Sequence, residues 1–274
     1  MPDNVTTDSG KVRVGAVSFL NALPLIEGLE DNARVVLTRT VPSRLAGMLD
    51  RGEVDVALVP VIDCMPPGRD WSIVSDACIA CDGATLTVRV FSRFDPDDVD
   101  TLHVDCDSRS SVVLASVIWR EKYGRALKVL PFQAAQPSPA ILANCQAVLL
   151  IGDKVIQPPV GLEVFSTQID LGAAWKSLTG LPFVFAAWVA SSRAVGDRVA
   201  GILAEARDAG VARAPQIAEE HAPHMGWPVD LARRYLTEYL SFTLTDRHRE
   251  GMQRFVELAK RYELVSTAEE PVSA

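Results

Sequence analysis

The sequence predicts an α/β protein of two lobes that enclose a ligand-binding cleft. Short β-branched or apolar runs alternate with helical patterns twice along the chain, and a mainly helical region follows them. The length of 274 residues is also one at which a single hydrophobic core tends to divide in two. Extended segments at 86–91 and 181–190 are the natural crossings between the lobes. We therefore expect residues 1–86 and 186–274 to form the first lobe and residues 87–185 to form the second.

The N-terminal part of the chain has the pattern β-α-β-α-β. Its β-branched and apolar runs predict strands, and the last run, VDVALVPV, is typical of a buried parallel strand. Asn21 offers a helix cap ahead of Pro24, and Pro42 begins a second helix whose apolar residues share one face. The strands are expected at 11–18, 34–40 and 54–61.

In the rest of the chain, further apolar runs are separated by turns, and the last third has helical spacing. Asp82-Gly83 is a turn signal, and Gly124 ends a predicted helix that follows a polar loop. The strands are expected at 71–79, 86–91, 101–104, 127–132, 147–151 and 181–190, and the helices at 112–123, after 195, at 231–240 and at 252–262.

Acidic residues outnumber basic ones. The chain has 35 Asp and Glu against 27 Lys and Arg, which gives a net charge of −8 and a pI of about 5.1. Nucleic acids and anionic membranes need a positive surface, so we expect neither as a partner. A small anionic ligand is compatible with this charge, because a pocket can differ in sign from the whole protein. The longest apolar stretch is about half of a membrane span, and residues 1–10 lack the features of a secretory signal, so we expect a cytoplasmic protein.

Cysteine and histidine do not form a metal-binding pattern. The five cysteines are odd in number and scattered, which does not indicate a disulfide framework. Cys78 and Cys81 form an isolated C-x-x-C, for which we favour buried thiols over a redox or metal role. Pro223 separates His221 from His224 and disrupts the spacing that would place both on one helix face. Sequence motifs of dinucleotide-binding proteins, nucleoside triphosphatases, serine hydrolases and zinc proteases are also absent. We therefore expect no metal.

Four polar loops follow predicted strands, and open α/β sheets bind ligands at the carboxyl ends of their strands. The third loop offers hydroxyls, free backbone N–H groups and the positive end of a helix dipole beside Arg109, which suits a carboxylate or phosphate. For each loop alone, ordinary helix capping is the alternative. The candidate residues are Ser18 and Asn21 in the first loop, Asp82, Gly83, Thr85 and Thr87 in the second, Ser108, Arg109, Ser110 and Ser111 in the third, and Gly152 and Asp153 in the fourth.

Several motifs, taken together and in order, resemble one enzyme family. They are VSFLNALPL at 17–25, VDVALVPV at 54–61, CDG at 81–83, SRSSV at 108–112, LLIGD at 149–153 and DLGAAWKSLTGLPFVFAAW at 170–188. The chain resembles the chorismate dehydratases of the futalosine route to menaquinone. This resemblance implies the fold of type II periplasmic binding proteins, used for cytoplasmic catalysis. It also implies the loss of water from chorismate to give 3-[(1-carboxyvinyl)oxy]benzoate, a reaction that needs no cofactor because the ring becomes aromatic.

The resemblance further implies roles for the candidate residues. Asn21 would hydrogen bond near the reacting ring, and Ser110 with Ser111 would bind one substrate carboxylate. A serine is expected shortly after the Asp-Gly turn, where this sequence has Thr87, which keeps the hydroxyl and adds a methyl group. Asn21 and Thr87 are thus the expected catalytic residues. Two groups are candidates for the base: a carboxylate of the substrate itself, as the resemblance implies, and Asp153, for which we favour the structural role of a helix cap. The expected substrate-binding residues are Ser18, Asp82, Gly83, Ser108, Arg109, Ser110, Ser111, Gly152 and Asp153.

Two other functions are consistent with the sequence. A protein of the same fold could bind a small carboxylate in the cytoplasm, as a sensor, without any chemistry. The enzyme of the same pathway that forms dihydroxynaphthoate is a further alternative. It is the weaker one, because the opening motif here is SFLN and the histidine-bearing motif expected of that enzyme is missing.

Overall fold

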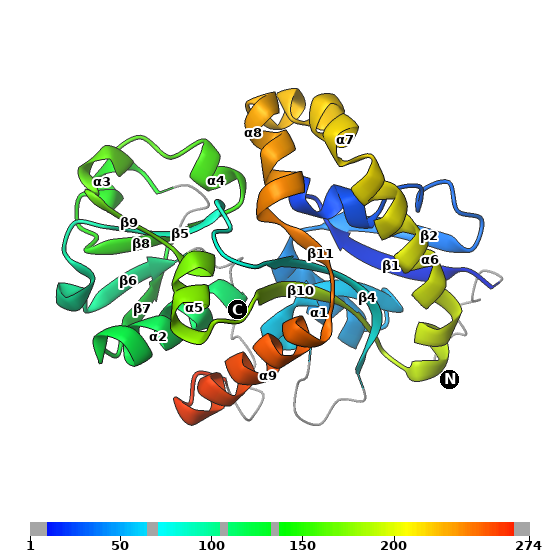
Figure 1. The fold of residues 1–274 in the computed structure, drawn as a ribbon, viewed down its shortest axis with the longest axis horizontal. Coiled ribbons are helices and arrows are strands. Elements are labelled where there is room, and N and C mark those ends of the chain that lie inside the picture. The colour runs from blue at the N-terminus through cyan, green and yellow to red at the C-terminus, as the bar shows by residue number, and fades with distance from the viewer. Residues whose placement is uncertain (1–9, 65–70, 105–108, 133–136, 266–274) are drawn as a thin grey trace, which may run out of the picture.

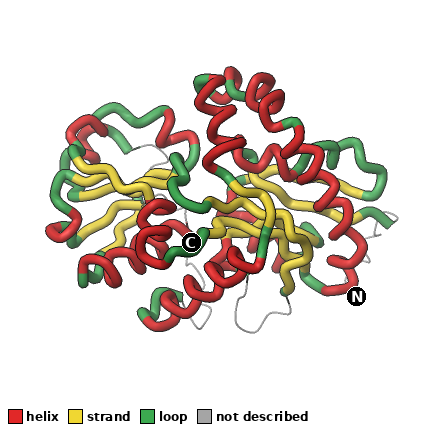
Figure 2. Tube along the Cα trace, viewed as in Figure 1, coloured by secondary structure: helices red, strands yellow, loops and turns green. Residues whose placement is uncertain are grey.

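Two β-sheets with helices packed against them make up the computed structural model (Figures 1 and 2). The structure describes residues 10–64, 71–104, 109–132 and 137–265. The larger sheet has the order β11 (Ser241–Thr243), β4 (Ser72–Cys81), β10 (Phe183–Ala190), β3 (Val56–Pro60), β1 (Val12–Val17) and β2 (Val35–Thr40). The smaller sheet has the order β7 (Lys128–Pro131), β6 (Thr101–Val104), β8 (Ala147–Ile151), β5 (Val88–Ser92) and β9 (Thr167–Asp170). The predicted α/β class is thus confirmed.

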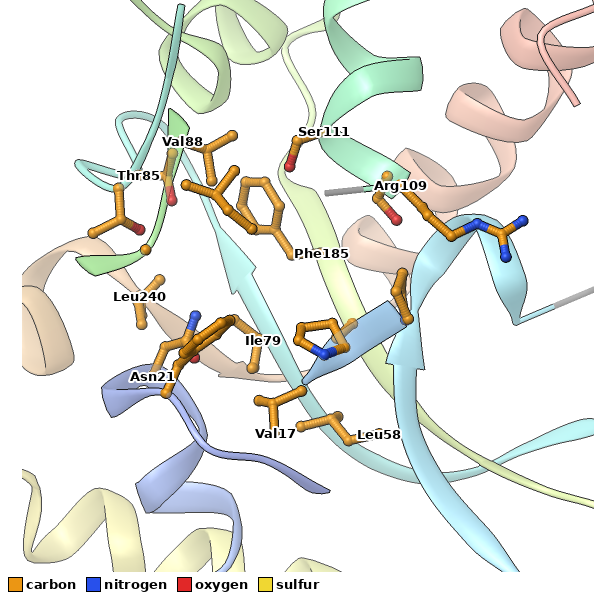
Figure 3. A pocket seen from close by; sticks show the side chains of 18 of the residues that line it. Val17, Asn21, Leu58, Ile79, Thr85, Val88, Arg109, Ser111, Phe185 and Leu240 are labelled. Atoms are coloured by element: carbon orange, nitrogen blue, oxygen red, sulfur yellow. The ribbon is translucent and has the colours of Figure 1, made fainter. Parts of the chain in front are cut away.

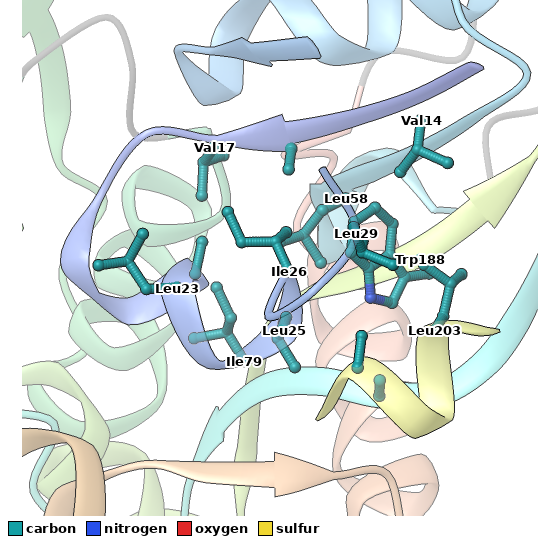
Figure 4. Close-up of a cluster of buried hydrophobic side chains, with 14 of the residues drawn as sticks. Val14, Val17, Leu23, Leu25, Ile26, Leu29, Leu58, Ile79, Trp188 and Leu203 are labelled. Atoms are coloured by element: carbon teal, nitrogen blue, oxygen red, sulfur yellow. The ribbon is translucent and has the colours of Figure 1, made fainter. Parts of the chain in front are cut away.

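The larger sheet mixes parallel and antiparallel strands around a deep core. β1 pairs in parallel with β2 and β3, whereas β10 runs antiparallel to β3 and β4. Every residue of β3 is buried, which explains why its sequence is continuously apolar rather than alternating. Helix α6 (Arg193–Ala212) and the 3₁₀ helix Leu20–Leu25 pack on this sheet, with Trp188 and Leu203 in the shared core (Figure 4).

The smaller sheet has its own core. β6 is parallel to β7 and β8, and β5 is antiparallel to β8 and β9. Helices α2 (Arg109–Tyr123) and α5 (Leu171–Thr179) pack together beside it and contribute the fully buried Trp119 and Trp175. The remaining α-helices are α1 (Pro42–Asp50), α3 (Pro139–Leu142), α4 (Asp153–Ile156), α7 (Ala214–His221), α8 (Val229–Arg234) and α9 (Asp246–Arg261).

The chain passes between the two sheets after β4 and again after α5. The strands of the smaller sheet all lie within 88–170, and those of the larger sheet lie before or after that range. The lobe boundaries at 86/87 and 185/186 stay a prediction. Helix α9 packs near the second crossing (Figure 1). There the Phe255 ring forms T-shaped contacts with the rings of Trp175 and Phe183. Within the described residues, no helix has the length and apolar composition needed to cross a membrane.

Most strands expected from apolar runs are present, and the strand at 147–151 has the expected bounds. Three local expectations are wrong. Asn21 is not a helix cap, since it lies inside a 3₁₀ helix that Phe19 caps and that contains Pro24. The helix expected from 112 begins at Arg109, so Ser110 and Ser111 lie in its first turn. The helix expected at 231–240 is α8 followed by a π-helical segment, Tyr235–Tyr239.

Candidate functional site

A cavity opens where the two sheets and their crossing segments meet (Figure 3). It holds about 680 Å³ of space, counting the solvent at its open mouth. One wall comes from the larger sheet and the C-terminal region: Val17, Phe19, Asn21, Pro42, Leu58, Pro60, Ile79, Phe185, Ala186, Tyr235 and Leu240. The other comes from the crossing after β4 and from the second sheet with its helices: Thr85, Thr87, Val88, Arg109, Ser110, Ser111, Ile151 and Gly152.

The N-terminus of α2 forms one polar end of the cavity. The Arg109 guanidinium lies 3.1 Å from the carboxylate of Asp63, whose side chain is only 9% exposed, whereas the side chain of Arg109 is 57% exposed. The Ser110 Oγ accepts a hydrogen bond from the backbone N–H of Ile62 at 3.2 Å, and Ser110 lines the cavity. Together with the helix dipole, these groups suit an anionic oxygen. Ser108, the remaining candidate in this loop, lies outside the described residues.

A cluster of three side chains forms another polar part of the wall. The Thr87 Oγ1 and the Tyr235 hydroxyl are 2.7 Å apart, and both residues are buried. Asn21 also lines the cavity, and its Oδ1 is buried without a hydrogen-bond partner among the described residues. Burial raises the pKa of Tyr235 far above its usual value, more than the hydrogen bond with Thr87 lowers it. The phenol is therefore neutral and is a hydrogen-bonding group rather than a base.

The backbone around Thr87 is held in an unusual conformation. Leu86 has a φ of 67°, which is uncommon outside glycine, and the Thr87 N–H donates to the carbonyl of Thr85 at 2.7 Å. The carboxylate of Asp170 accepts hydrogen bonds from the N–H groups of Thr85 and Leu86 at 3.0 and 2.8 Å. The N–H of Gly152 donates to the Thr87 carbonyl at 2.8 Å. These bonds fix the turn that brings the Thr87 hydroxyl to the cavity.

Asp153 lies beside the cavity but is not among the residues that line it. It is the first residue of α4, and Gly152 occupies the cap position, so the expected capping role is wrong. Its Oδ1 instead accepts a hydrogen bond from Trp227 Nε1 at 2.6 Å. Burial raises the pKa of Asp153, and the Trp227 hydrogen bond only partly offsets this.

Three other candidates also lie outside the cavity lining. Ser18 is exposed, and its Oγ donates to the carbonyl of Thr40 at 3.4 Å. Asp82 is exposed and forms an ion pair with Lys176. Gly83 supplies a backbone turn with a φ of 140°, where any other residue would be strained. The structure therefore brings together Asn21, Thr87, Arg109, Ser110, Ser111 and Gly152 around one cavity.

A family model described as menaquinone biosynthesis matches residues 12–261, nearly the whole described chain. The chain belongs to this menaquinone biosynthesis family. A relative named chorismate dehydratase, from Thermus thermophilus, is 26% identical over 259 residues, which cover 89% of this chain and 93% of that protein.

Solved structures place this member of the menaquinone biosynthesis family among proteins with the periplasmic-binding-protein fold. Protein AF1704 from Archaeoglobus fulgidus aligns with a TM-score of 0.72 at 14% identity, over 94% of this chain and 100% of that one. The alkanesulfonate-binding protein SsuA from Xanthomonas axonopodis pv. citri, bound to MOPS, aligns with a TM-score of 0.67 at 14% identity, over 95% of this chain and 96% of that one. The fold expected from the sequence motifs is thus confirmed.

Two residues of the site in this menaquinone biosynthesis family member are not expected from the sequence. Tyr235 lies in a helical run and has the spacing of an ordinary core residue. Asp170 begins α5, and its Oδ1 accepts the N–H of Ala173 as a helix cap, which is a recognisable sequence signal. Its hydrogen bonds with the N–H groups of Thr85 and Leu86 join distant parts of the chain, and a local sequence pattern does not predict them.

Proposed function

We propose that this protein is a chorismate dehydratase that converts chorismate to 3-[(1-carboxyvinyl)oxy]benzoate in the cytoplasm. Membership of the menaquinone biosynthesis family and the similarity to the Thermus thermophilus enzyme support this reaction. The lobes, with residues 1–86 and 186–274 in one and 87–185 in the other, would enclose the substrate between them. In this proposal the reaction is a lyase reaction, and it uses no cofactor.

The composition of the cavity wall carries the proposal. Among the described lining residues there is one cation, Arg109, several neutral donors, and no carboxylate or imidazole. Such a site suits a ligand that is an anion and that brings its own base. Chorismate has two carboxylates and so meets both requirements. The apolar side chains of the wall, among them Leu58, Ile79 and Phe185, suit its ring.

The elimination balances without any further reactant. A carboxylate of the substrate removes the ring proton next to the departing hydroxyl, and the electrons of that C–H bond form a ring double bond. The C–O bond then breaks, and the hydroxyl leaves as water once it has taken up a proton. Aromatisation drives the reaction, so the protein must chiefly hold the substrate in one conformation and stabilise the departing oxygen.

Each part of the site has a place in this proposal. Arg109, Ser110 and Ser111 at the end of α2 bind one carboxylate of chorismate. Asn21 and Thr87 hydrogen bond near the reacting carbon and the departing hydroxyl. Tyr235 is buried and neutral and therefore does not remove the proton. Gly152 supports Thr87 through its backbone.

A binding protein without chemistry is the second candidate, because the SsuA proteins that share this fold are named for the sulfonates that they bind. Incubation of the purified protein with chorismate, followed by mass spectrometry, separates the two. A product lighter by one water supports the dehydratase. Saturable binding of chorismate without that product favours the binding protein. If the protein shows neither binding nor product, both candidate functions are rejected.

A further inference from the structure

The Tyr235 hydroxyl contacts a residue of the cavity wall that comes from a distant part of the chain. Tyr235 is only 2% exposed, and its hydroxyl lies 2.7 Å from the Thr87 Oγ1, 148 positions away in the sequence. It starts the π-helical segment after α8, and such segments are rare and often occur at functional sites. Its ring stacks on Trp227 with centroids 5.0 Å apart, a contact that phenylalanine would make equally well. Packing therefore explains the ring but not the hydroxyl.

The direction of the hydrogen bond follows from the donors available. The Tyr235 and Thr87 hydroxyls can each donate, and Thr87 is the hydrogen-bond partner that the Tyr235 hydroxyl has within the described residues. Burial keeps the pKa of the phenol high and the phenol protonated. A phenol has one proton to give, and the Thr87 Oγ1 is the acceptor within reach.

The consequence for Thr87 is that its own proton is not used by Tyr235. Within the described part of the chain, Tyr235 is the hydrogen-bond partner of the Thr87 hydroxyl, and Thr87 lines the cavity. We propose that Tyr235 is a positioning residue that donates to Thr87, so that the Thr87 hydroxyl donates its proton to an oxygen of the bound substrate. This inference rests on the proposed function, in which that oxygen belongs to the departing hydroxyl.

The proposed arrangement stabilises charge where it develops. As the C–O bond breaks, electron density builds on the departing oxygen, and a donor already aimed at it needs no reorganisation. Without Tyr235, the Thr87 hydroxyl rotates freely and also donates to other acceptors. Loss of the Tyr235 hydroxyl should therefore lower the rate only when residue 87 has a hydroxyl group.

A double-mutant cycle tests this dependence. The variants are Tyr235→Phe, Thr87→Val, the double variant, and Thr87→Ser with and without Tyr235→Phe. We expect Tyr235→Phe to lower kcat about tenfold or more with little change in KM, because the lost interaction acts in the transition state. Thr87→Val should lower kcat at least as much, and Tyr235→Phe should have little further effect in its presence. In the Thr87→Ser background, which keeps the hydroxyl, the effect of Tyr235→Phe should persist.

Tyr239→Phe is the matched control, since Tyr239 belongs to the same π-helical segment, is partly exposed and pairs with Arg234. It should leave kcat unchanged. Three results would overturn the inference: near-normal kcat in Tyr235→Phe, near-normal kcat in Thr87→Val, or the same fold-loss from Tyr235→Phe whether residue 87 is threonine or valine. The Thr87→Val result decides even if Tyr235→Phe does not fold.

The unmodified protein separates this inference from the proposed function. If it does not consume chorismate, the dehydratase proposal fails. The dissociation constant for chorismate is then measured by calorimetry for the same set of variants. Coupling between residues 87 and 235 in that constant would support the positioning role, and additive effects would overturn it. If the protein neither converts nor binds chorismate, both proposals fail.

Discussion

The indole Nε1 of Trp227 donates a hydrogen bond to the Oδ1 of Asp153 over 2.6 Å. Asp153 begins α4, directly after a strand of the smaller sheet, and Trp227 lies in the C-terminal region just before α8. The Trp227 ring also stacks on Tyr235, with an interplanar angle of 24°. Beside this contact, Gln157 Nε2 donates to the carbonyl of Met225 at 2.7 Å. These interactions tie the two parts of the protein together next to the cavity.

The raised pKa of Asp153 predicts a pH-dependent stability difference for Asp153→Asn. An acid whose pKa is raised in the folded state favours folding at low pH, and this contribution is lost as the pH rises through the folded-state pKa. The asparagine side chain does not titrate, and its Oδ1 can still accept the hydrogen bond from Trp227 Nε1. The free energy of unfolding of Asp153→Asn relative to the unmodified protein should therefore increase above about pH 4, the usual pKa range of aspartate. Denaturant unfolding across pH measures this difference, and a constant difference would contradict the prediction.

Removal of the Asp170 carboxylate should destabilise the turn that carries Thr87. The carboxylate accepts three backbone N–H groups, those of Thr85, Leu86 and Ala173. Hydrogen bonds to a charged group contribute about 1.5–3 kcal/mol each, so Asp170→Ala should lose about 3 kcal/mol or more of unfolding free energy. Asp100→Ala is the control, since Asp100 forms an exposed pair with Arg125, worth at most about 1 kcal/mol. Equal losses in the two variants, measured by urea unfolding, would refute the role of Asp170.

Arg109→Ala should weaken substrate binding. Arg109 is the one cation among the described residues that line the cavity, and a charge-assisted hydrogen bond contributes about 1.5–3 kcal/mol. We expect KM for chorismate to rise about 10- to 100-fold, with a smaller change in kcat, and Arg109→Lys to be intermediate. Arg125→Ala, which removes an exposed cation just after α2, should leave KM unchanged. A KM for Arg109→Ala within about twofold of normal would exclude Arg109 from substrate binding.

The strands of the fold are predictable where both faces are buried. Residues 147–151 form a continuous apolar run because nearly all of them lie inside the smaller sheet, and the predicted bounds are those observed. β9, by contrast, is short and largely half-exposed, so Thr167–Asp170 has no such run and no strand is predicted there. Helix α5 follows it directly and is missed with it.

The site is predictable where it rests on polar loops, and not where it rests on tertiary contacts. Asn21, Thr87 and the start of α2 are expected, since polar residues after apolar strands are visible in sequence. Tyr235 has the helical spacing of a core residue, and only the folded chain brings its hydroxyl to Thr87. Asp82 is expected in the site because it follows a strand, yet its side chain is exposed and pairs with Lys176.

The rate of chorismate conversion by the unmodified protein and by Asn21→Ala is the most direct test of the proposed function. Proton NMR would follow the ring signals of chorismate and the appearance of aromatic ring signals with the enolpyruvyl group retained. We predict conversion by the unmodified protein and a kcat about 100-fold lower in Asn21→Ala, with an unchanged fold by circular dichroism. No aromatic product from the unmodified protein would contradict the dehydratase function, and a near-normal rate in Asn21→Ala would contradict the assignment of this cavity as its active site.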